Sequence, residues 1–467
     1  MLTSRDRMMA LEGVAGGGKT TSLAAVREGA ERAGYQVEGL APTSRAAQKL
    51  AEAGIETHTL QRHLARGEQQ DDSQKRLYVV DESSMASTKQ IHTFVERLRE
   101  NDRVLFVGDV RQHEAVEAGR PYAQLQEAGM RTARLDEIIR QKDPALKEAV
   151  EQLARGEVRE AVGNLNSQGR VHEIGDRQER ISEIAREYVR SPQRTLVVSP
   201  DNASRREINE AIHRTMQSEG KVGSNEQRVH VLYARQDVTG ADRRHAQNYE
   251  RGDVLRYSKG SKPLGIGPGE YARVSHVDRE SNTLTVKRHG GEELSYDPRR
   301  LQGVTVYRDS ERKFAEGDRV QLTAPYHEQK LANRELATIE RIAGDGNLKL
   351  RTDSGREVEF NARQHPHLDY GYAVTSHSSQ GQTADRVLIH VDTEQARAEL
   401  INSRMAYVSV SRAQFDVQMY TNDAKALGYE LSRDVSHPTA IQQEPAAMQR
   451  IEPQAVGRDV SQGLSAG

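Results

Sequence analysis

The sequence contains no cysteine and no tryptophan, and only 4% of its 467 residues are aromatic. The lack of cysteine excludes disulfides, thiolate zinc sites and cysteine nucleophiles, and it fits a reducing compartment such as the cytosol. Few aromatic rings are available for stacking on nucleobases. No apolar run approaches the ~20 residues that a membrane span requires, and the charged N-terminus is unlike a signal peptide. We therefore expect a cytoplasmic protein without membrane insertion.

An excess of one charge is also missing. Because 67 Lys and Arg residues balance 69 Asp and Glu residues, any nucleic-acid interface must be a local basic patch. The chain does have length: 467 residues exceed the roughly 100 to 200 residues of one domain. Several globular units are therefore expected.

Short apolar runs alternate with amphipathic stretches in the first third of the chain and return later. They are MMAL (8–11), LYVV (77–80), VLFV (104–107), TLVV (195–198) and RVLIHV (386–391). This alternation is typical of βαβ units around a parallel sheet. The sequence therefore predicts an α/β fold, in which residues 144–190 are mostly helical and a second α/β unit begins near TLVV.

Residues 251–365 have a different texture, with short valine- and threonine-bearing strands between glycine turns. The motif GDVL (252–255) returns as GDRV (317–320), and each copy precedes a strand, a turn and a strand. This repeat predicts two small β-barrel-like units in tandem, and a single larger sheet is the alternative. Residues 431–467 are rich in Pro, Gln, Gly and Ala, which predicts a disordered tail.

A glycine-rich motif follows the first strand-like run. The segment GVAGGGKTT (13–21) contains the pattern G-x-x-x-x-G-K-[ST] between a predicted strand and a predicted helix. In that context the backbone amides surround phosphates at a helix N-terminus, which predicts a nucleotide site. Lys19 is expected to reach the β- and γ-phosphates, and Thr20 to bind Mg²⁺. The other expected nucleotide contacts are Gly13, Gly16, Gly17, Gly18 and Thr21.

Two later strands end in polar residues at the edge where ligands of such sheets bind. LYVV is followed by Asp81, a candidate ligand of Mg²⁺, and by Glu82, a candidate base for the attacking water. VLFV is followed by Gly108-Asp109 and then by Gln112, a neutral side chain suited to sense the γ-phosphate. Together with the glycine-rich motif, these patterns predict an enzyme that hydrolyses ATP with Mg²⁺.

Seven ordered blocks of the sequence resemble the motif series of superfamily 1 DNA helicases of the RecD-like branch. They are GVAGGGKTT, APTSRAAQKL, VVDESSM, VGDVRQHEAVEAG, EIIRQ, AVTSHSSQGQT and AYVSVSRA. The run TSHSSQGQT is particularly similar to the helicase portion of conjugative relaxases of the TraI and TrwC type, and the resemblance covers about residues 7–425. It implies two RecA-like lobes, at 1–140 and at 141–250 with 366–430, that hold ATP between them and single-stranded DNA across their tops.

The resemblance also implies roles for single residues near ATP. Arg140 in EIIRQ and Arg412 in VSVSRA match positions where such helicases place arginines on the γ-phosphate. Gln380 and Gly381 match the motif that links the DNA track to ATP. For Arg140 and Arg412, an ordinary structural role is the alternative.

Further residues match positions that contact DNA in this family. Residues 251–365 correspond to an insertion that closes over the strand, with Asn333 and Arg334 facing DNA. The other candidates are Thr43, Arg45, Thr57, His58, Thr375 and His377. Capping or turn roles stay open for the first four, and His377 can equally be a packed histidine.

The resemblance implies an ATP-dependent translocase or helicase that moves 5′ to 3′ on single-stranded DNA, in a conjugative transfer system with other DNA-processing proteins. Only 12 residues precede Gly13, where these helicases usually carry a glutamine segment that reads adenine, and the nicking tyrosines of a relaxase domain are missing. DNA nicking is therefore not expected. The alternatives are a nucleotide-gated clamp that binds single strands without unwinding, and a recruitment module.

Overall fold

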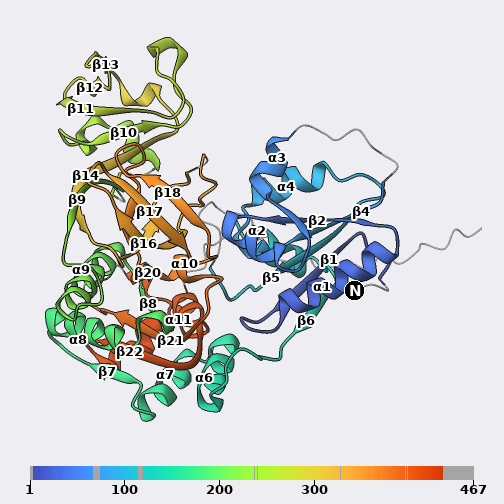
Figure 1. Ribbon diagram of the computed structural model, residues 1–467. Helices are drawn as coiled ribbons and strands as arrows, with labels where there is room; N and C mark the ends of the chain where they lie inside the picture. Colours follow the sequence, from blue (N-terminus) through green and yellow to red (C-terminus); the bar gives the residue numbers. More distant parts are fainter. Residues whose placement is uncertain are drawn as a thin grey trace, which may run out of the picture.

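The computed structural model describes residues 4–66, 74–113, 119–235, 237–238, 240–326, 328–394, 396 and 398–434. The predicted disordered tail lies, from residue 435 onward, outside these residues. No helix in the described part is long and apolar enough to cross a membrane. The predicted α/β fold is confirmed: two parallel sheets form two lobes, and two small antiparallel sheets accompany the second lobe (Figure 1).

The first lobe is built on a six-stranded parallel sheet in the order β3-β2-β4-β5-β1-β6. β1 lies between β5 and the edge strand β6, and its apolar residues Ala10 and Leu11 are fully buried on opposite faces of the sheet. The C-terminal ends of β1, β4 and β5 meet at one edge, so the segments that follow them are neighbours. The strands are β1 (Met8–Gly13), β2 (Gln36–Ala41), β3 (Glu56–Thr59), β4 (Arg76–Val80), β5 (Arg103–Gly108) and β6 (Thr132–Leu135), and the helices are α1 (Lys19–Arg32), α2 (Ser44–Ala51), α3 (Leu60–Ala65), α4 (Thr88–Glu96) and α5 (Pro121–Glu127).

The second lobe has a five-stranded parallel sheet in the order β20-β8-β21-β22-β7. The predicted helical region contains three helices, and the first begins as expected, with Asp143 accepting a hydrogen bond from Leu146 N ahead of Pro144. The strands are β7 (Val171–Glu173), β8 (Thr195–Ser199), β20 (Ala373–Thr375), β21 (Ala384–Val391) and β22 (Ala413–Thr421), and the helices are α6 (Pro144–Arg155), α7 (Val158–Ser167), α8 (Arg177–Arg190), α9 (Asn202–Ser218), α10 (Ser376–Ser379), α11 (Ser403–Val410) and α12 (Ala424–Leu431).

The two small sheets lie in the sequence between α9 and β20. Their strand orders are β13-β12-β11-β10-β14-β9 and β18-β17-β16-β15-β19. The first sheet includes β9, and the second includes β19, so strand pairing extends beyond residues 251–365 at both ends. The strands are β9 (Gln227–Ala234), β10 (Val254–Tyr257), β11 (Glu270–Asp278), β12 (Thr283–Arg288), β13 (Glu293–Tyr296), β14 (Val304–Phe314), β15 (Arg319–Leu322), β16 (Leu336–Ile342), β17 (Asn347–Thr352), β18 (Glu357–Asn361) and β19 (Leu368–Tyr370).

The repeat seen in the sequence is also a repeat of local structure. Asp253 and Asp318 occupy equivalent positions, because each carboxylate accepts a hydrogen bond from a backbone amide three residues earlier. Each is followed by a four-stranded antiparallel meander, β10 to β13 and β15 to β18, with a register shift in the second strand. The predicted pair of small β units is therefore found, in place of a single larger sheet.

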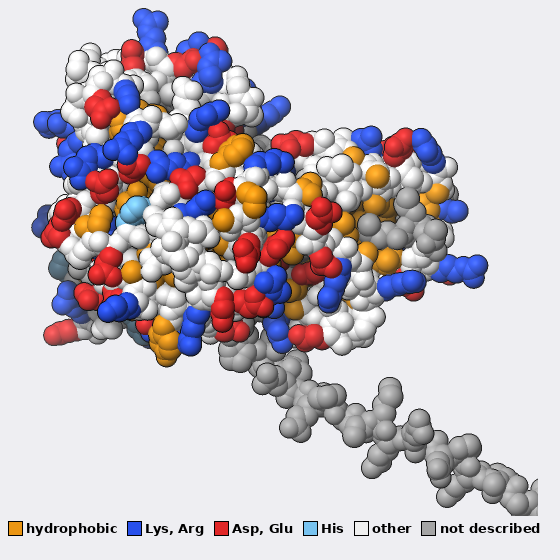
Figure 2. All heavy atoms as spheres, turned by 90° about the horizontal axis from the view of Figure 1, so that it is seen from below, with side chains coloured by type: hydrophobic (Ala, Val, Ile, Leu, Met, Phe, Trp, Pro, Cys, Tyr) orange, Lys and Arg blue, Asp and Glu red, His pale blue; other side chains and the backbone are white. Residues whose placement is uncertain are grey.

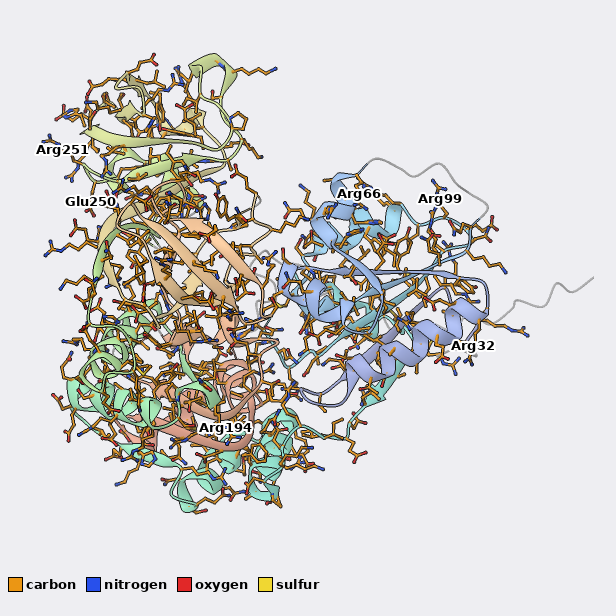
Figure 3. All side chains as sticks on the ribbon, viewed as in Figure 1. Arg32, Arg66, Arg99, Arg194, Glu250 and Arg251 are labelled. Atoms are coloured by element: carbon orange, nitrogen blue, oxygen red, sulfur yellow. The ribbon has the colours of Figure 1, made fainter. Side chains whose placement is uncertain are left out.

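The arrangement of the parts puts the first lobe beside the second, while the two small sheets are stacked above the second lobe (Figure 1). On the face drawn in Figure 2, positive and negative side chains are interspersed, as the near-neutral net charge predicts. Glu250 and Arg251 lie on the side of the small sheets that is turned away from the first lobe (Figure 3).

Candidate nucleotide site and interlobe groove

The loop between β1 and α1 is shaped for the close approach of a ligand. Gly16 and Gly18 have φ angles of 83° and 75°, which only glycine adopts easily. A Cβ on Gly16 would lie 2.6 Å from Arg140 Cβ, so the loop also has no room for a side chain there. Gly18 precedes α1 without a side-chain cap, so the first amides of α1 are free to bind an anion. These features fit a phosphate group.

A cavity of about 350 Å³ lies directly over this loop, between the lobes. Lys19, whose Nζ donates a 2.6 Å hydrogen bond to Gly13 O, lines it from the first lobe, and Arg412 lines it from the second. The cavity therefore brings together side chains that are far apart in the sequence. Among the predicted residues, those lining it are Gly16, Gly17, Gly18, Lys19, Thr20, Thr21, Asp81, Glu82, Gln112, Arg140, Gly381 and Arg412.

Asp81 and Glu82 follow β4 at the edge of the sheet that faces this cavity. Glu82 has a φ of 49°, in the left-handed region that residues other than glycine rarely adopt. Burial, followed by the nearby charge of Glu82, raises the pKa of Asp81 to about 6. A carboxylate whose ionised form is disfavoured by burial gains from a bound cation. Asp81 and Thr20 therefore suit a metal ion at this position.

The Tyr407 hydroxyl, on α11 of the second lobe, joins two segments of the first lobe. It accepts a hydrogen bond from Ala15 N at 2.7 Å and donates one to Asp109 Oδ2 at 2.8 Å. The ring is buried, with 1% of its surface exposed. This contact ties α11 to the glycine-rich loop and to the end of β5. The sequence reasoning missed Tyr407, although it lies in the block AYVSVSRA.

A chain of hydrogen bonds runs from Asp109 through Gln112 and Gln380 to Glu82. Gln112 Nε2 donates to Asp109 at 2.9 Å, so Gln112 Oε1 is left to accept from Gln380 Nε2 at 3.0 Å. Gln380 Nε2 also donates to Glu82 Oε2 at 3.1 Å. Gln380 Oε1 is then a buried acceptor without a partner in the described part of the chain. Such an atom costs about 1–3 kcal/mol, so this arrangement of Gln380 carries an energetic penalty.

The two predicted arginines both line the cavity. Arg140 donates to Ser411 O at 2.7 Å, and burial, followed by the charge of Arg412, lowers its pKa to about 9. Arg412 is 2% exposed, and among the described residues it donates to three neutral oxygens, Val408 O, Gln382 O and Ser411 Oγ. Burial lowers the pKa of Arg412 as well. Both cations line one cavity, and neither forms an ion pair with a carboxylate of the described residues, so the cavity favours the binding of an anion.

Arg404 also crosses from the second lobe to the first. It donates to the carbonyl oxygens of Val110 and Gln112, at 3.0 and 2.7 Å. Arg404 lies one helical turn before Tyr407 on α11, so one helix face holds the whole segment 109–112. Sequence reasoning had no signal for this contact, because it joins residues 292 positions apart.

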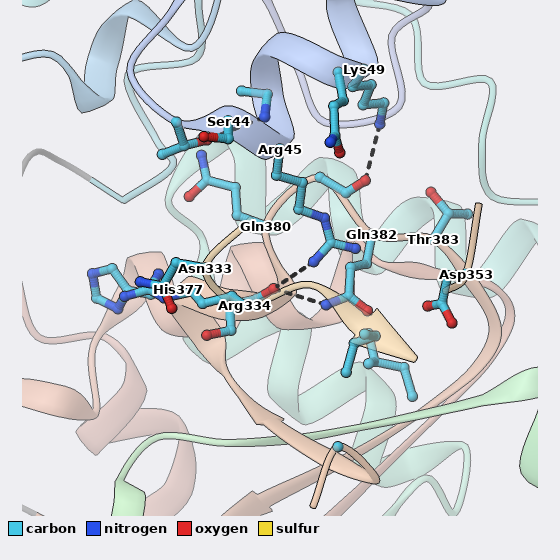
Figure 4. Close-up of a pocket in the computed structure, with 18 of the residues that line it drawn as sticks. Ser44, Arg45, Lys49, Asn333, Arg334, Asp353, His377, Gln380, Gln382 and Thr383 are labelled. Atoms are coloured by element: carbon cyan, nitrogen blue, oxygen red, sulfur yellow. Dashed lines mark hydrogen bonds between the residues drawn. The ribbon is translucent and has the colours of Figure 1, made fainter. Parts of the chain in front are cut away.

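A second, larger cavity of about 2050 Å³ runs between the lobes and along the second small sheet, and we call it the interlobe groove. Arg45 lies within it and donates to Ser378 O at 3.3 Å, where Gln382 Nε2 also donates (Figure 4). Arg62, Arg194 and Arg319 add positive charge that was not predicted. Of the predicted DNA contacts, the groove is lined by Thr43, Arg45, Asn333, Arg334 and His377, and Gln380 and Gly381 line it too.

The remaining predicted DNA contacts are not among the residues that line the groove. Thr57 Oγ1 donates to Ile55 O, and His58 lies 3.5 Å from Glu56, so both are engaged locally at β3. Thr375 caps α10 by accepting a hydrogen bond from Ser378 N. Thr43 caps α2 in the same way but also lines the groove. Roles in DNA binding for these threonines and for His58 stay predictions.

The His377 ring is packed against a histidine of the other lobe. His113 and His377 are stacked, with ring centroids 3.8 Å apart and an interplanar angle of 11°. His113 Nε2 also forms a hydrogen bond with Ser376 Oγ. Burial lowers the pKa of His377 to about 4 and that of His113 well below 6.5, so both rings are neutral at pH 7. His377 is thus both a packed histidine and a residue of the groove wall.

Comparisons with known proteins identify relatives of the chain. A family model described as an AAA domain matches residues 1–176. The chain is 26% identical over 500 aligned residues to the multifunctional conjugation protein TraI of Escherichia coli strain K12. The alignment covers 94% of this chain and 28% of TraI. It is 25% identical over 417 residues to the ATP-dependent RecD2 DNA helicase of Deinococcus radiodurans. That alignment covers 87% of this chain and 46% of RecD2.

A solved structure has the same fold. The crystal structure of Bacteroides Pif1 bound to ssDNA matches 92% of this chain and 94% of its own, with a TM-score of 0.51 and 16% identity. The chain itself spans less than a third of TraI and less than half of RecD2. The sequence relatives lead to one conclusion: the chain has an AAA domain and is homologous to the helicase region of TraI and to the RecD2 DNA helicase.

Proposed function

We propose that this chain is an ATP-driven translocase that moves on single-stranded DNA and unwinds duplexes ahead of it. The observation that carries the proposal is that Lys19 of the first lobe and Arg412 of the second line one cavity. A triphosphate held there would contact both lobes. Because the cavity lies on the interface, binding and loss of the γ-phosphate would close and open the lobes.

The residues at this cavity suit the chemistry of ATP hydrolysis. Lys19 and the amides of the loop before α1 would hold the β- and γ-phosphates, and Thr20 with Asp81 would hold Mg²⁺, which supplies charge neutralisation. Glu82 would orient the attacking water and accept its proton. Arg140 and Arg412 would stabilise the charge that develops on the transferred group, and an arginine in this role is worth ~10³ or more in rate.

The interlobe groove suits a single strand held by its backbone. It is large enough for an extended polymer, at about 2050 Å³, and arginines reach it from both lobes and from the second small sheet. Such cations and hydroxyl groups bind phosphates without reading sequence, which is what a translocase needs. The crystal structure of Bacteroides Pif1 bound to ssDNA, which shares the fold, supports DNA as the ligand.

The finer parts of the proposal rest on the relatives. TraI is a conjugation protein, so we place the chain in conjugative DNA transfer, without a relaxase domain of its own among these 467 residues. Movement in the 5′ to 3′ direction follows the resemblance to the RecD-like branch. A cytoplasmic location and contacts with other DNA-processing proteins belong to the same proposal.

The test is the ATPase rate with and without oligo(dT), followed by strand displacement on duplexes that carry a 5′ or a 3′ tail. Wild-type protein should hydrolyse ATP faster with DNA and should release a strand only from the 5′-tailed duplex. Lys19→Ala should abolish both activities, whereas Lys425→Ala, an exposed lysine on α12, should change neither. DNA-dependent ATP hydrolysis without strand release would identify a clamp, and an unchanged Lys19→Ala rate would refute the proposal.

A further inference from the structure

The wall between the two cavities contains a lysine to which none of the sequence patterns gave a role. Lys49 lines both the nucleotide cavity and the interlobe groove, as Asp81, Glu82 and Gly381 also do. Of these shared residues, Lys49 alone carries a positive charge. A cation that faces two cavities built for phosphates is placed to respond to either of them.

Lys49 forms no ion pair with a carboxylate in the part of the chain that the structure describes, although the charges of Glu82 and Asp81 act on it. Its Nζ donates a 3.1 Å hydrogen bond to the Gly381 carbonyl oxygen, which is its one hydrogen bond in the described part of the chain (Figure 4). An ammonium group has three donors, so two remain for other acceptors. Burial, followed by the charges of Arg140 and Arg412, lowers the pKa of Lys49. The ammonium would therefore be stabilised by an anion placed in either cavity.

The acceptor of the Lys49 hydrogen bond, Gly381 O, belongs to the segment 378–381, and Gly381 lines both cavities. Gly381 follows Gln380, whose side chain contacts Gln112 and Glu82 at the nucleotide cavity. Gly381 has a φ of 77°, and a Cβ built there would have no described atom within 4 Å. The peptide at Gly381 therefore has room to turn. Arg45, one helical turn before Lys49 on α2, donates to Ser378 O in the same segment. Two side chains of α2 thus hold the segment 378–381 by its backbone.

We propose that Lys49 exchanges the Gly381 carbonyl for the γ-phosphate when a nucleoside triphosphate binds, and so releases the segment 378–381 toward the groove. Lys49 then contributes to binding of the triphosphate and not of the diphosphate. The release changes how the groove holds DNA, because Gln380, Gly381 and Ser378 all line it. The inference rests on the proposed function, and it names the residue that transmits the nucleotide state to the DNA groove.

The test compares the affinities of the full chain for ADP and for AMP-PNP, each with Mg²⁺, by calorimetry. Lys49→Met should weaken AMP-PNP binding by about tenfold or more, the effect of losing one charge-assisted hydrogen bond, and should leave ADP binding within about twofold. Lys49→Arg, which keeps the charge, should recover part of the AMP-PNP affinity. Lys89→Met, an exposed lysine on α4, is the matched control and should bind both nucleotides as the wild type does.

A second measurement tests whether the bound nucleotide changes DNA binding in the interlobe groove. The affinity for oligo(dT) is measured with AMP-PNP and with ADP, and wild-type protein should show different values. In Lys49→Met the two values should become equal. A variant that keeps the wild-type ratio, or that weakens ADP and AMP-PNP equally, overturns the role of Lys49. Wild-type protein that binds neither AMP-PNP nor oligo(dT) refutes the proposed function itself, so the two failures are distinguishable.

Discussion

Tyr407 and Asp109 lie 298 positions apart in the chain, yet the tyrosine hydroxyl donates a 2.8 Å hydrogen bond to the aspartate across the lobe interface. Ala15 N donates to the same oxygen of Tyr407. Two residues beyond the end of α11, Arg412 lines the nucleotide cavity. One helix of the second lobe is therefore fixed both to the glycine-rich loop and to the strand end that carries Gln112.

Replacing Tyr407 by Phe removes the hydroxyl and keeps the ring. The buried Ala15 amide then loses its acceptor, which should lower the free energy of unfolding by about 1–3 kcal/mol. We expect kcat for ATP to fall more than KM rises, because Arg412 would be less well positioned. Tyr249→Phe is the control, since it removes a buried hydroxyl that donates to Arg243 O, far from the interface. Equal effects of the two variants on kcat would contradict the positioning role.

Arg412→Lys tests the arginine that reaches the nucleotide cavity from α11. Lysine keeps a positive charge but cannot match the three hydrogen bonds of the planar guanidinium. We expect the ATPase rate to fall by about 10³ or more, with an unchanged circular dichroism spectrum and ADP affinity. Single-turnover hydrolysis measures the chemical step directly. A rate within about tenfold of the wild type would show that Arg412 does not act on the γ-phosphate.

Much of the fold is predictable because its signals are local. The apolar runs at β1, β4, β5 and β8 are buried strands, and the repeated GD motif marks the first strand of each small meander. The three-residue strands β7 and β19 and the eight-residue strand β9 were not predicted. Their pairing partners lie elsewhere in the chain, so the local sequence contains too little of the pattern that stabilises them.

The candidate site is predictable only in part, for the same reason. The loop that leads to Lys19 follows β1, and Asp81 and Glu82 follow β4, so topology alone places them at one edge of the sheet. The contacts of Arg404 and Lys49 join segments about 300 positions apart, and no local pattern encodes such pairs. The resemblance predicted Arg140 and Arg412 near the γ-phosphate, and both line the nucleotide cavity; their roles there stay predictions.

The stacked pair His113 and His377 predicts a dependence of stability on pH. Both pKa values are lowered in the folded protein, and that of His377 is about 4 against the usual 6.5. The unfolded chain then binds more protons, so the free energy of unfolding should decrease as the pH falls from 6.5 toward 4. Arg334 and Arg404 add to this effect, because their charges oppose protonation of the pair.

Urea unfolding at pH 7.5, 6.5 and 5.5 measures this dependence. His377→Gln should flatten the decrease between pH 6.5 and 5.5, since one of the two rings can no longer gain a proton in the unfolded state. His92→Gln, on the exposed face of α4, should keep the wild-type dependence. A His377→Gln curve that parallels the wild-type curve would show that the pair does not control the acid sensitivity.

The groove predicts how DNA binding depends on salt. If Arg334 contacts one phosphate, Arg334→Gln should reduce the slope of log K against log[salt] by about 0.7, the value for one contact on a single strand. Arg251→Gln should leave the slope unchanged, because Arg251 lies on the small sheets away from the first lobe (Figure 3). Fluorescence anisotropy with oligo(dT) at several salt concentrations gives both slopes. A loss of affinity at constant slope would assign Arg334 a structural role.

The central claim is that closure of the cavity between Lys19 and Arg412 drives movement along DNA. Its most direct measurement is the time that the protein takes to reach a fluorophore at the 3′ end of oligo(dT) strands of increasing length. With ATP, the account predicts a lag that grows in proportion to strand length, and with AMP-PNP it predicts none. DNA-stimulated ATP hydrolysis with an arrival time independent of length would contradict it.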